Sequence, residues 1–267
     1  MISVDSAIVR ARRGSQLSTL LNFALIAVII LIPFAVNQFR LPIDPIIALS
    51  VVGAIWVVLL LRSLRGSRLV ADSPSLIASG QYDTAEQRID TALRSFSIFR
   101  AVKLLGLHHL AALRHAQNRW PDVVKLCRAL LAQKRVANQG IARSTQLMLA
   151  DSLLELDDMP GVASSLSHLY TQRLSLGEAL SLMLAQLDYE SRLGAWDNMM
   201  RGANTKATLA ELMPTNKSAR AQALLALAAR RTGRNDWEGW LRRRVELLVD
   251  PQELCVRRPI LTELWLA

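Results

Sequence analysis

Two uncharged apolar runs near the start of the 267-residue chain constrain its fold more than any other feature. The first extends from Leu17 to Val36 and the second from Ile46 to Leu61, with nine residues between them. A helix of about 20 residues is about 30 Å long, which matches the hydrocarbon core of a bilayer. The second run has 16 residues, near the lower limit for a span. We therefore predict a transmembrane helical hairpin over residues 17–61.

A secretory signal peptide and a buried core helix are the alternatives to this interpretation. Arg10, Arg12 and Arg13 resemble the basic segment of a signal peptide. The first run is, however, longer than the usual stretch of about 7 to 15 apolar residues, and no small-residue cleavage site follows it. The second run alone would suit a core helix. Because it directly follows a full-length span, a return across the membrane is the simpler interpretation.

Positive charge flanks both runs on their outer sides. Three arginines precede the first run and three follow the second: Arg10, Arg12, Arg13, Arg62, Arg65 and Arg68. The connecting loop Asn37–Pro45 holds Arg40 against Asp44. Lys and Arg concentrate on the cytoplasmic side of membrane proteins. We therefore expect a multi-pass membrane protein whose termini and large following domain lie in the cytoplasm.

The composition of the remaining chain favours an all-α domain. Glycine is scarce, with 12 residues in 267, and Leu and Ala recur three and four residues apart, the spacing of an amphipathic helix. Cys127 and Cys255 are the two cysteines, and they are far apart in the sequence. This makes a disulfide framework or a zinc site improbable.

A loose pattern with a period of 37 to 41 residues recurs through this domain. In each copy a polar turn is followed by an aromatic residue or Met, then by a small or apolar residue three positions later and another four positions after that. The copies are Tyr82, Ala85, Ile89; Trp120, Val123, Cys127; Met159, Val162, Leu166; Trp196, Met199, Ala203; and, less regularly, Trp237, Trp240, Arg244. Such a period indicates stacked supersecondary units.

Each copy has the pattern of two helices joined by a polar turn. The turns fall at residues 79–81, 117–119, 156–158, 193–195 and 233–235. Pro121 and Pro160 stand at the expected start of the second helix, where proline loses no hydrogen bond. One such pair cannot bury its own apolar face, so we predict about five helical hairpins stacked into an α-solenoid.

Here the chain resembles the tetratricopeptide repeat family. Gly80-Gln81-Tyr82-Asp83-Thr84-Ala85 is similar to the family's turn and second helix, and Gly194-Ala195-Trp196 repeats it. Ala111 and Ala150 stand seven residues before their turns, where the family has a small residue. The resemblance covers residues 71–250, although the period is longer than the family's 34 or so. It implies a scaffold that binds a peptide or a helix of another protein.

The order of elements, two N-terminal spans followed by repeats, is also similar to that of HemY-type bacterial membrane proteins. This resemblance of layout implies a bacterial inner membrane and an accessory role in a biosynthetic pathway. No residue motif extends it to haem chemistry. The principal expectation is a scaffold that recruits a protein partner at the cytoplasmic membrane face, and the alternative is a structural subunit of a larger membrane complex.

Charge is distributed unevenly along the domain. Residues 98–150 contain nine Lys or Arg against one acid, and residues 151–190 contain seven acids against one Arg. The basic band is close in sequence to the predicted anchor, so anionic lipids of the cytoplasmic leaflet are a candidate partner beside a protein. An ordinary solvated surface is the alternative. The candidate contacts to lipid or partner are Arg100, Lys103, Arg114, Arg119, Lys125, Arg128, Lys134 and Arg135.

Catalytic and ligand-binding patterns are not found in the sequence, so we expect no enzyme, no cofactor and no metal site. His108 and His115 could share a helix face, but no carboxylate lies in the same stretch to complete a site. Cys127 is interpreted as a small buried hydrophobe. Phosphate-binding loops, nucleophile elbows and nucleic-acid motifs are missing, so nucleic acid is not expected as a partner.

The predicted organisation has five parts. They are a basic N-terminus (1–16), the transmembrane hairpin (17–61), a basic linker (62–70), the repeat domain (71–250) and a C-terminal segment (251–267). The last part carries Leu254, Ile260, Leu261, Leu264 and Trp265. These side chains either cap the open end of the last hairpin or remain exposed as a docking motif.

Overall fold

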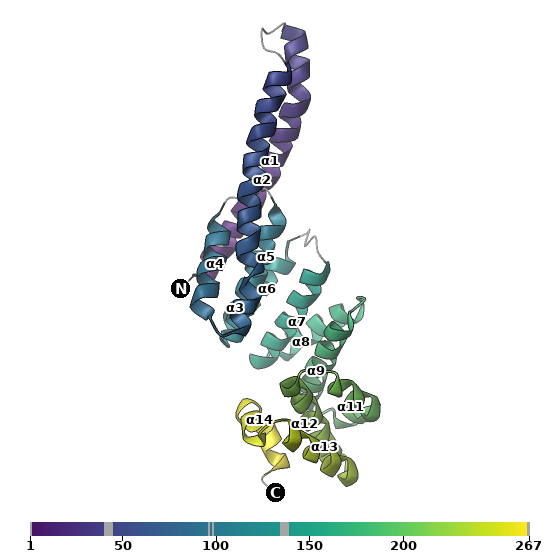
Figure 1. Cartoon of the computed structure of the whole chain (residues 1–267). Helices are drawn as coiled ribbons and strands as arrows, with labels where there is room; N and C mark the ends of the chain where they lie inside the picture. Colours follow the sequence, from purple (N-terminus) through teal and green to yellow (C-terminus); the bar gives the residue numbers. More distant parts are fainter. Residues whose placement is uncertain (1, 40–44, 96, 98, 134–138, 266–267) are drawn as a thin grey trace. The chain divides into compact units, whose positions relative to one another are not determined.

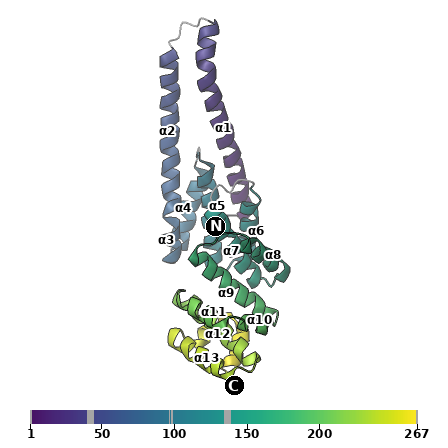
Figure 2. The ribbon, with the colours of Figure 1, turned by 90° about the vertical axis from the view of Figure 1, so that its right-hand side faces the viewer.

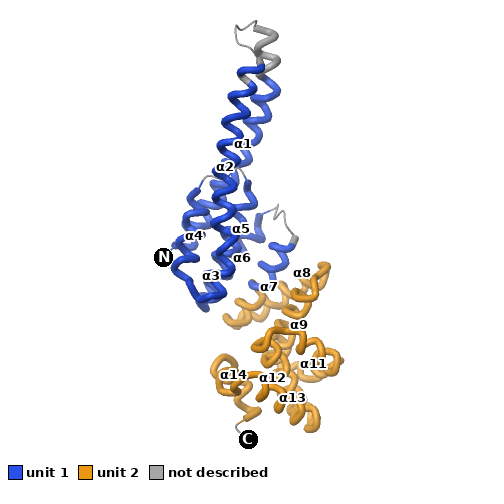
Figure 3. The backbone as a smooth tube through the Cα atoms, viewed as in Figure 1, with its two compact units in different colours: residues 1–148 blue, residues 149–267 orange. Residues whose placement is uncertain are grey.

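A computed structural model describes residues 2–39, 45–95, 97, 99–133 and 139–265. Throughout these ranges every regular element is helical, which confirms the predicted all-α class. The chain divides into two compact units, residues 1–148 and 149–267 (Figure 3). Each unit is described separately below.

Unit 1 begins with two long helices, α1 (Val4–Phe39) and α2 (Pro45–Ala71). Both are long and apolar enough to cross a membrane, as predicted. The two helices lie side by side and extend beyond the rest of the unit (Figures 1 and 2). Large apolar side chains are exposed along them, such as Phe23 at 69% and Ile46 at 71%. These surfaces are suited to lipid rather than to water.

The same two helices also take part in the core of unit 1. The first four turns of α1 pack against α4 (Tyr82–Arg94), α5 (Arg100–Ala116) and α6 (Trp120–Leu131). The buried residues of this part recur three or four positions apart, as one face of a helix requires: Val4, Ala7, Ala11, Ser15 and Ser18. The last part of α2 is also buried against unit 1: the helix continues past the apolar run to Ala71, and Ser63 and Val70 are buried. Residues 4–16 and 62–70, expected as a separate terminus and linker, are thus continuous with α1 and α2.

Five connections between helices share one backbone geometry. A residue at positive φ, between 57° and 76°, ends the first helix of each pair: Gly80, Asn118, Asp157, Gly194 and Gly233. The next amide donates to a carbonyl five residues earlier, as from Gln81 to Leu76 and from Arg234 to Ala229. This is the Schellman arrangement that closes a helix end. The helices joined in this way are α3 (Ser73–Ala78) to α4, α5 to α6, α7 (Gln139–Glu155) to α8 (Met159–Tyr170), α9 (Leu176–Arg192) to α10 (Trp196–Met200), and α12 (Thr215–Arg231) to α13 (Asn235–Leu248).

The second and third positions of the predicted repeat are buried in the first four copies, whereas the aromatic residue or Met at the first position is partly buried. The residue three after the start of the second helix is fully buried in each, as Ala85 and Met199 illustrate, and the residue four positions later is also buried. The predicted register is wrong in the fifth copy. The turn falls at residues 232–234 and α13 begins at Asn235. Trp240 is 40% exposed, and Leu241 and Val245 are buried instead.

Unit 2 is built around α12, in which every residue from Ala221 to Ala229 is buried. The second helix of the fourth pair is interrupted at Gly202, which has a φ of 65°, and continues as α11 (Ala203–Glu211). The chain ends in α14 (Pro251–Arg257) and a 3₁₀ helix, η1 (Pro259–Leu264). Leu261 and Leu264 of η1 are fully buried in the core around α12. The C-terminal segment therefore caps unit 2, and these two leucines are not an exposed docking motif.

Candidate functional sites

Arg114, predicted as a surface contact, lies in the interior of unit 1 with its side chain fully buried. Its Nη2 donates to Glu86 Oε1 at 2.9 Å and to the carbonyl of Ile2 at 3.1 Å. Burial alone would raise the pKa of Glu86, but hydrogen bonds from Arg114 and from the Ile2 amide outweigh it and lower that pKa. The prediction for Arg114 is therefore wrong: this residue ties the start of the chain to α4 and α5.

Lys103, another predicted surface contact, is 3% exposed. Its ammonium donates to the carbonyls of Ala92 (2.9 Å) and Leu93 (2.7 Å) and also to that of Ser95. These groups stand at the end of α4, where unpaired carbonyls favour a cation. Burial lowers the pKa of Lys103 to about 8. Lys103 is thus a buried C-cap of α4 and is not available to lipid or partner.

The other members of the basic band are dispersed. Arg100, at the start of α5, donates to Gln133 Oε1 at 3.0 Å, whereas Arg119 follows the far end of α5 and pairs with Asp122 at 2.5 Å. Lys125 and Arg128 are exposed on α6. Lys134 and Arg135 lie outside the described residues. Of the eight predicted residues, the six that the structure describes therefore do not form one surface.

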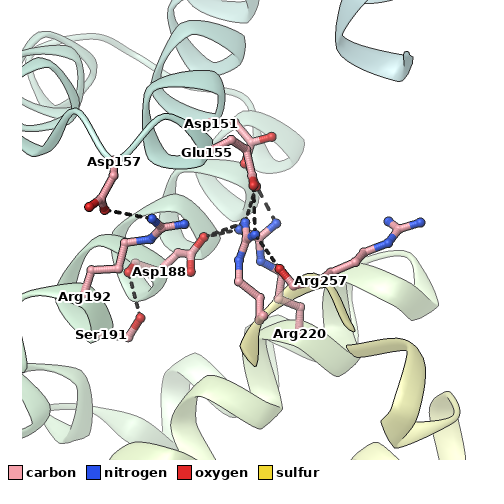
Figure 4. Close-up of polar contacts among 9 residues, drawn as sticks. Asp151, Glu155, Asp157, Asp188, Ser191, Arg192, Arg220 and Arg257 are labelled. Carbon is pink, nitrogen blue, oxygen red and sulfur yellow. Dashed lines mark hydrogen bonds and ion pairs between the residues drawn. The ribbon is translucent and has the colours of Figure 1, made fainter. Parts of the chain in front are cut away.

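The acidic band of the sequence is largely neutralised inside unit 2. Asp188, 1% exposed, accepts from Arg258 at 3.0 Å and also from Arg220. Arg258 also pairs with Glu155, and Arg220 lies 3.9 Å from Asp151. Figure 4 shows these acids and cations converging from α7, α9, α12 and the C-terminal segment. Burial would lower the pKa of Arg258, but its bonds to Glu155 and Asp188 outweigh it and raise that pKa.

Three further acids of this band serve the ends of helices. Asp157 pairs with Arg192 at 3.0 Å, and Asp158 accepts from the Gly161 amide at 3.0 Å, capping α8. Glu178 completes a capping box with Ser175 at the start of α9. Helix capping and ion pairing account for these side chains. The acidic residues of this band therefore do not form a continuous acidic surface.

The histidine and cysteine groups of unit 1 are built into its packing. His108 Nδ1 lies 3.0 Å from Thr145 Oγ1, and burial, assisted by the neighbouring His109, lowers the pKa of His108 to about 4. Cys127 is fully buried, which raises the pKa of its thiol to about 12 and confirms its interpretation as a buried hydrophobe. Among the described residues no group of three His, Cys, Asp or Glu side chains could hold a metal ion.

An open polar groove of about 390 Å³ lies between the start of α1 and α4. Arg10 and Arg94 both pair with Asp90 there, at 3.0 and 2.7 Å. The lining residues are Ile2, Ser3, Ser6, Arg10, Glu86, Gln87, Asp90 and Arg94. The sequence interpretation missed this groove because it treated the N-terminus as a separate segment. Its charges are already paired, so it is a packing seam rather than a site for a charged ligand.

A second feature missed from the sequence is the place where α1 and α2 leave the rest of unit 1. Ser63 of α2 shares a hydrogen bond of 2.7 Å with Ser97 of the connection between α4 and α5. Gly14 of α1 packs against the Lys103 side chain, which leaves 3.2 Å between an added Cβ and Lys103 Cε. Phe99, in the same connection, is 42% exposed. The apolar parts of both helices therefore begin directly beside the α4–α5 connection.

Comparison with known protein families, curated proteins and solved structures gives no match for this chain. Function is therefore inferred from the arrangement of its own residues. The feature with the clearest functional content is the attachment of two membrane-length helices to a helical core through shared buried residues.

Proposed function

We propose that this protein is a membrane-anchored helical scaffold that binds a protein partner at the cytoplasmic face of a membrane. The observation that carries the proposal is the double role of α1. Its first turns are buried against α4, α5 and α6, and its later turns expose apolar side chains such as Leu20 and Ile30. The buried surface and the exposed apolar surface thus belong to one continuous helix. Because no flexible linker lies between these two parts of α1, the helix would join unit 1 rigidly to the bilayer.

The five matching helix ends support the binding part of this proposal. Identical Schellman turns and matching buried positions in the first four pairs are what a tandem repeat produces. We propose that the pairs stack as a solenoid similar to tetratricopeptide repeats and present a peptide- or helix-binding surface. The histidine, cysteine and acidic groups discussed above are occupied in packing, capping and ion pairs, which favours a binding role over catalysis.

The arginines that flank both apolar runs on their outer sides favour the proposed orientation, with both termini in the cytoplasm. Single-cysteine variants labelled with a membrane-impermeant maleimide test it, in a chain with Cys255 replaced by serine and Cys127 buried. Ser167→Cys, on the exposed side of α8, should react in inverted vesicles and not in intact cells. Leu41→Cys, between the runs, should show the opposite pattern. Equal labelling of both positions from one side would overturn the anchor and its orientation.

The partner is tested by affinity capture of the full chain from membranes solubilised in mild detergent. A scaffold should recover one or more proteins that dissociate from it during further purification. Persistent migration of the whole complex at fixed stoichiometry would favour the structural-subunit alternative. Recovery of the chain alone, together with turnover of a small substrate, would refute the scaffold and favour an enzyme.

A further inference from the structure

The end of unit 1 from which α1 and α2 emerge carries an exposed aromatic residue and several arginines. Phe99 is 42% exposed, and Arg100 follows it at the start of α5. Arg94 stands at the end of α4 with 65% of its side chain exposed. Arg62 and Arg65 are exposed on α2, and among the described residues neither makes an ion pair. We call Arg62, Arg65, Arg94, Phe99 and Arg100 the junction face.

Backbone and side-chain contacts fix these residues at a common level. Ser63, next to Arg62, is bonded to Ser97, two residues before Phe99. Gly66, next to Arg65, lies against Ser95, next to Arg94, with 3.0 Å between an added Cβ and Ser95 Oγ. The α4–α5 connection therefore stands beside the turn of α2 that directly follows Leu61, the last residue of the apolar run.

This level coincides with the depth expected for lipid headgroups. The part of α2 from Pro45 to Leu61 has 17 residues, which corresponds to about 26 Å of helix. That length takes up most of a hydrocarbon core of about 30 Å. Arg62 then falls at the boundary between acyl chains and phosphates, and the neighbouring Phe99 falls at the same depth. Aromatic rings favour this boundary, and arginines favour anionic headgroups.

We propose that the junction face rests on the surface of an anionic phospholipid bilayer, with the Phe99 ring at the acyl boundary and Arg62, Arg65 and Arg100 beside phosphate groups, while Arg94 keeps its ion pair with Asp90. The inference rests on the proposed membrane insertion of α1 and α2. It adds that unit 1 has a fixed contact with the lipid surface through α4 and α5, in addition to its two helices. The partner of this face is thus a lipid surface rather than a protein.

Three labelled variants of the full chain test the inference, each with Cys255 replaced by serine. Phe99→Cys reports the junction face, and Gly53→Cys reports the middle of α2, where an added Cβ meets nothing within 4 Å. Gln81→Cys is the matched control, because Gln81 is exposed at the opposite end of α4. Each is labelled with an environment-sensitive fluorophore and reconstituted in vesicles containing lipids that carry a quencher near the headgroup or in the acyl region.

The expected result is a blue shift and strong quenching at positions 53 and 99, with position 81 unaffected. Quenching at 99 by the shallow quencher should increase when anionic lipid replaces zwitterionic lipid. If 53 is quenched and 99 behaves like 81, the junction face is refuted while the anchor stands. Without quenching at 53, the proposed membrane insertion itself fails. Quenching at all three positions, or no dependence at 99 on lipid charge, would also overturn the inference.

A second measurement leaves Phe99 in place. Backbone hydrogen exchange of the unmodified chain is compared between vesicles and detergent micelles. Slower exchange in vesicles at the start of α5, with unchanged exchange at the start of α4, is expected from a membrane contact at the junction face. Equal exchange in both environments at the start of α5 would contradict it.

Discussion

Replacing Arg258 by alanine tests whether the C-terminal segment is held to unit 2 by its buried ion pairs. Arg258 is buried and bonded to both Glu155 and Asp188, and Asp188 is itself 1% exposed. Removing one partner of a buried pair costs about 3 to 5 kcal/mol, because it leaves an uncompensated charge. Asp188 keeps Arg220, so we expect the lower end of this range, about 3 kcal/mol.

The neighbouring residue supplies a matched control. Arg257 is the last residue of α14 and directly precedes Arg258, and its exposed side chain points away from the cluster (Figure 4). Arg257→Ala should change the free energy of unfolding by less than about 0.5 kcal/mol, the usual effect of a surface substitution. Both variants remove one positive charge and the same side-chain atoms, so their difference isolates the buried contacts.

Urea unfolding of the full chain in detergent micelles measures the difference. Four of the six tryptophans lie in unit 2, at 196, 237, 240 and 265, so their fluorescence reports mainly on that unit. With a slope of about 2 kcal/mol per molar urea, a loss of about 3 kcal/mol lowers the midpoint by about 1.5 M. Equal midpoints for Arg258→Ala and Arg257→Ala would refute the assignment of stability to this cluster. In a Glu155→Gln background the effect of Arg258→Ala should become smaller, because the two residues share one network.

Three further predictions concern the attachment of α1, the buried lysine and the helix ends. Ala11→Asp, which places an unpaired charge on the buried face of α1, should destabilise unit 1 by about 3 kcal/mol. Gln16→Asp on the exposed side should cost less than about 0.5 kcal/mol. Limited proteolysis of unit 1 measures both, and equal cleavage of the two variants would contradict the packing of the first turns of α1 against unit 1. Burial lowers the pKa of Lys103 from its ordinary 10.5 to about 8 in the folded chain, so between these pH values the unfolded chain binds more protons and the contribution of Lys103 to the free energy of unfolding should rise with pH. The urea midpoint of the wild type relative to that of Lys103→Met should therefore be higher at pH 10 than at pH 7.5. A difference that stays constant between the two pH values would contradict the burial of Lys103. Gly233→Ala, at a φ of 71°, should lower the free energy of unfolding by about 1 kcal/mol. Gly177→Ala, in the first turn of α9, should leave it unchanged or raise it by up to about 1 kcal/mol. If both substitutions lower the urea midpoint, the left-handed conformation of Gly233 would be contradicted.

Local signals in the sequence predicted a large part of this fold. The uncharged runs, the helical spacing of Leu and Ala, and the polar turns all depend on residues close together in the chain. Gly80 and Gly194 favour positive φ, and an apolar residue follows at a fixed distance, so the helix ends were predictable. The predicted register of the fifth copy was wrong because Trp237 and Trp240 match the spacing of the pattern but lie two residues farther from the turn at Gly233 than their counterparts do in the other copies.

The polar side chains in the interior of each unit depend on partners that are distant in the sequence, and these contacts were not predictable. Arg114 bonds to Ile2, 112 residues away, and Arg258 bonds to Glu155, 103 residues away. A helix pattern treats both arginines as solvent-facing, because their carboxylate and carbonyl partners lie on other helices. The spacing of Val4, Ala7 and Ala11 does carry a local sign of burial, but the adjacent arginines of the N-terminus obscured it.

The continuity of α1 also determines the order in which the molecule is completed. The ribosome makes α1 before the helices of unit 1 that pack against it. The buried stripe from Val4 to Ser18 packs against α4, α5 and α6, so its complement is complete only when Leu131, the last residue of α6, has been made. At about 5 to 20 residues per second, this interval of more than 100 residues lasts roughly 5 to 20 seconds. During synthesis, the first turns of α1 therefore remain incompletely packed until the rest of unit 1 has been made.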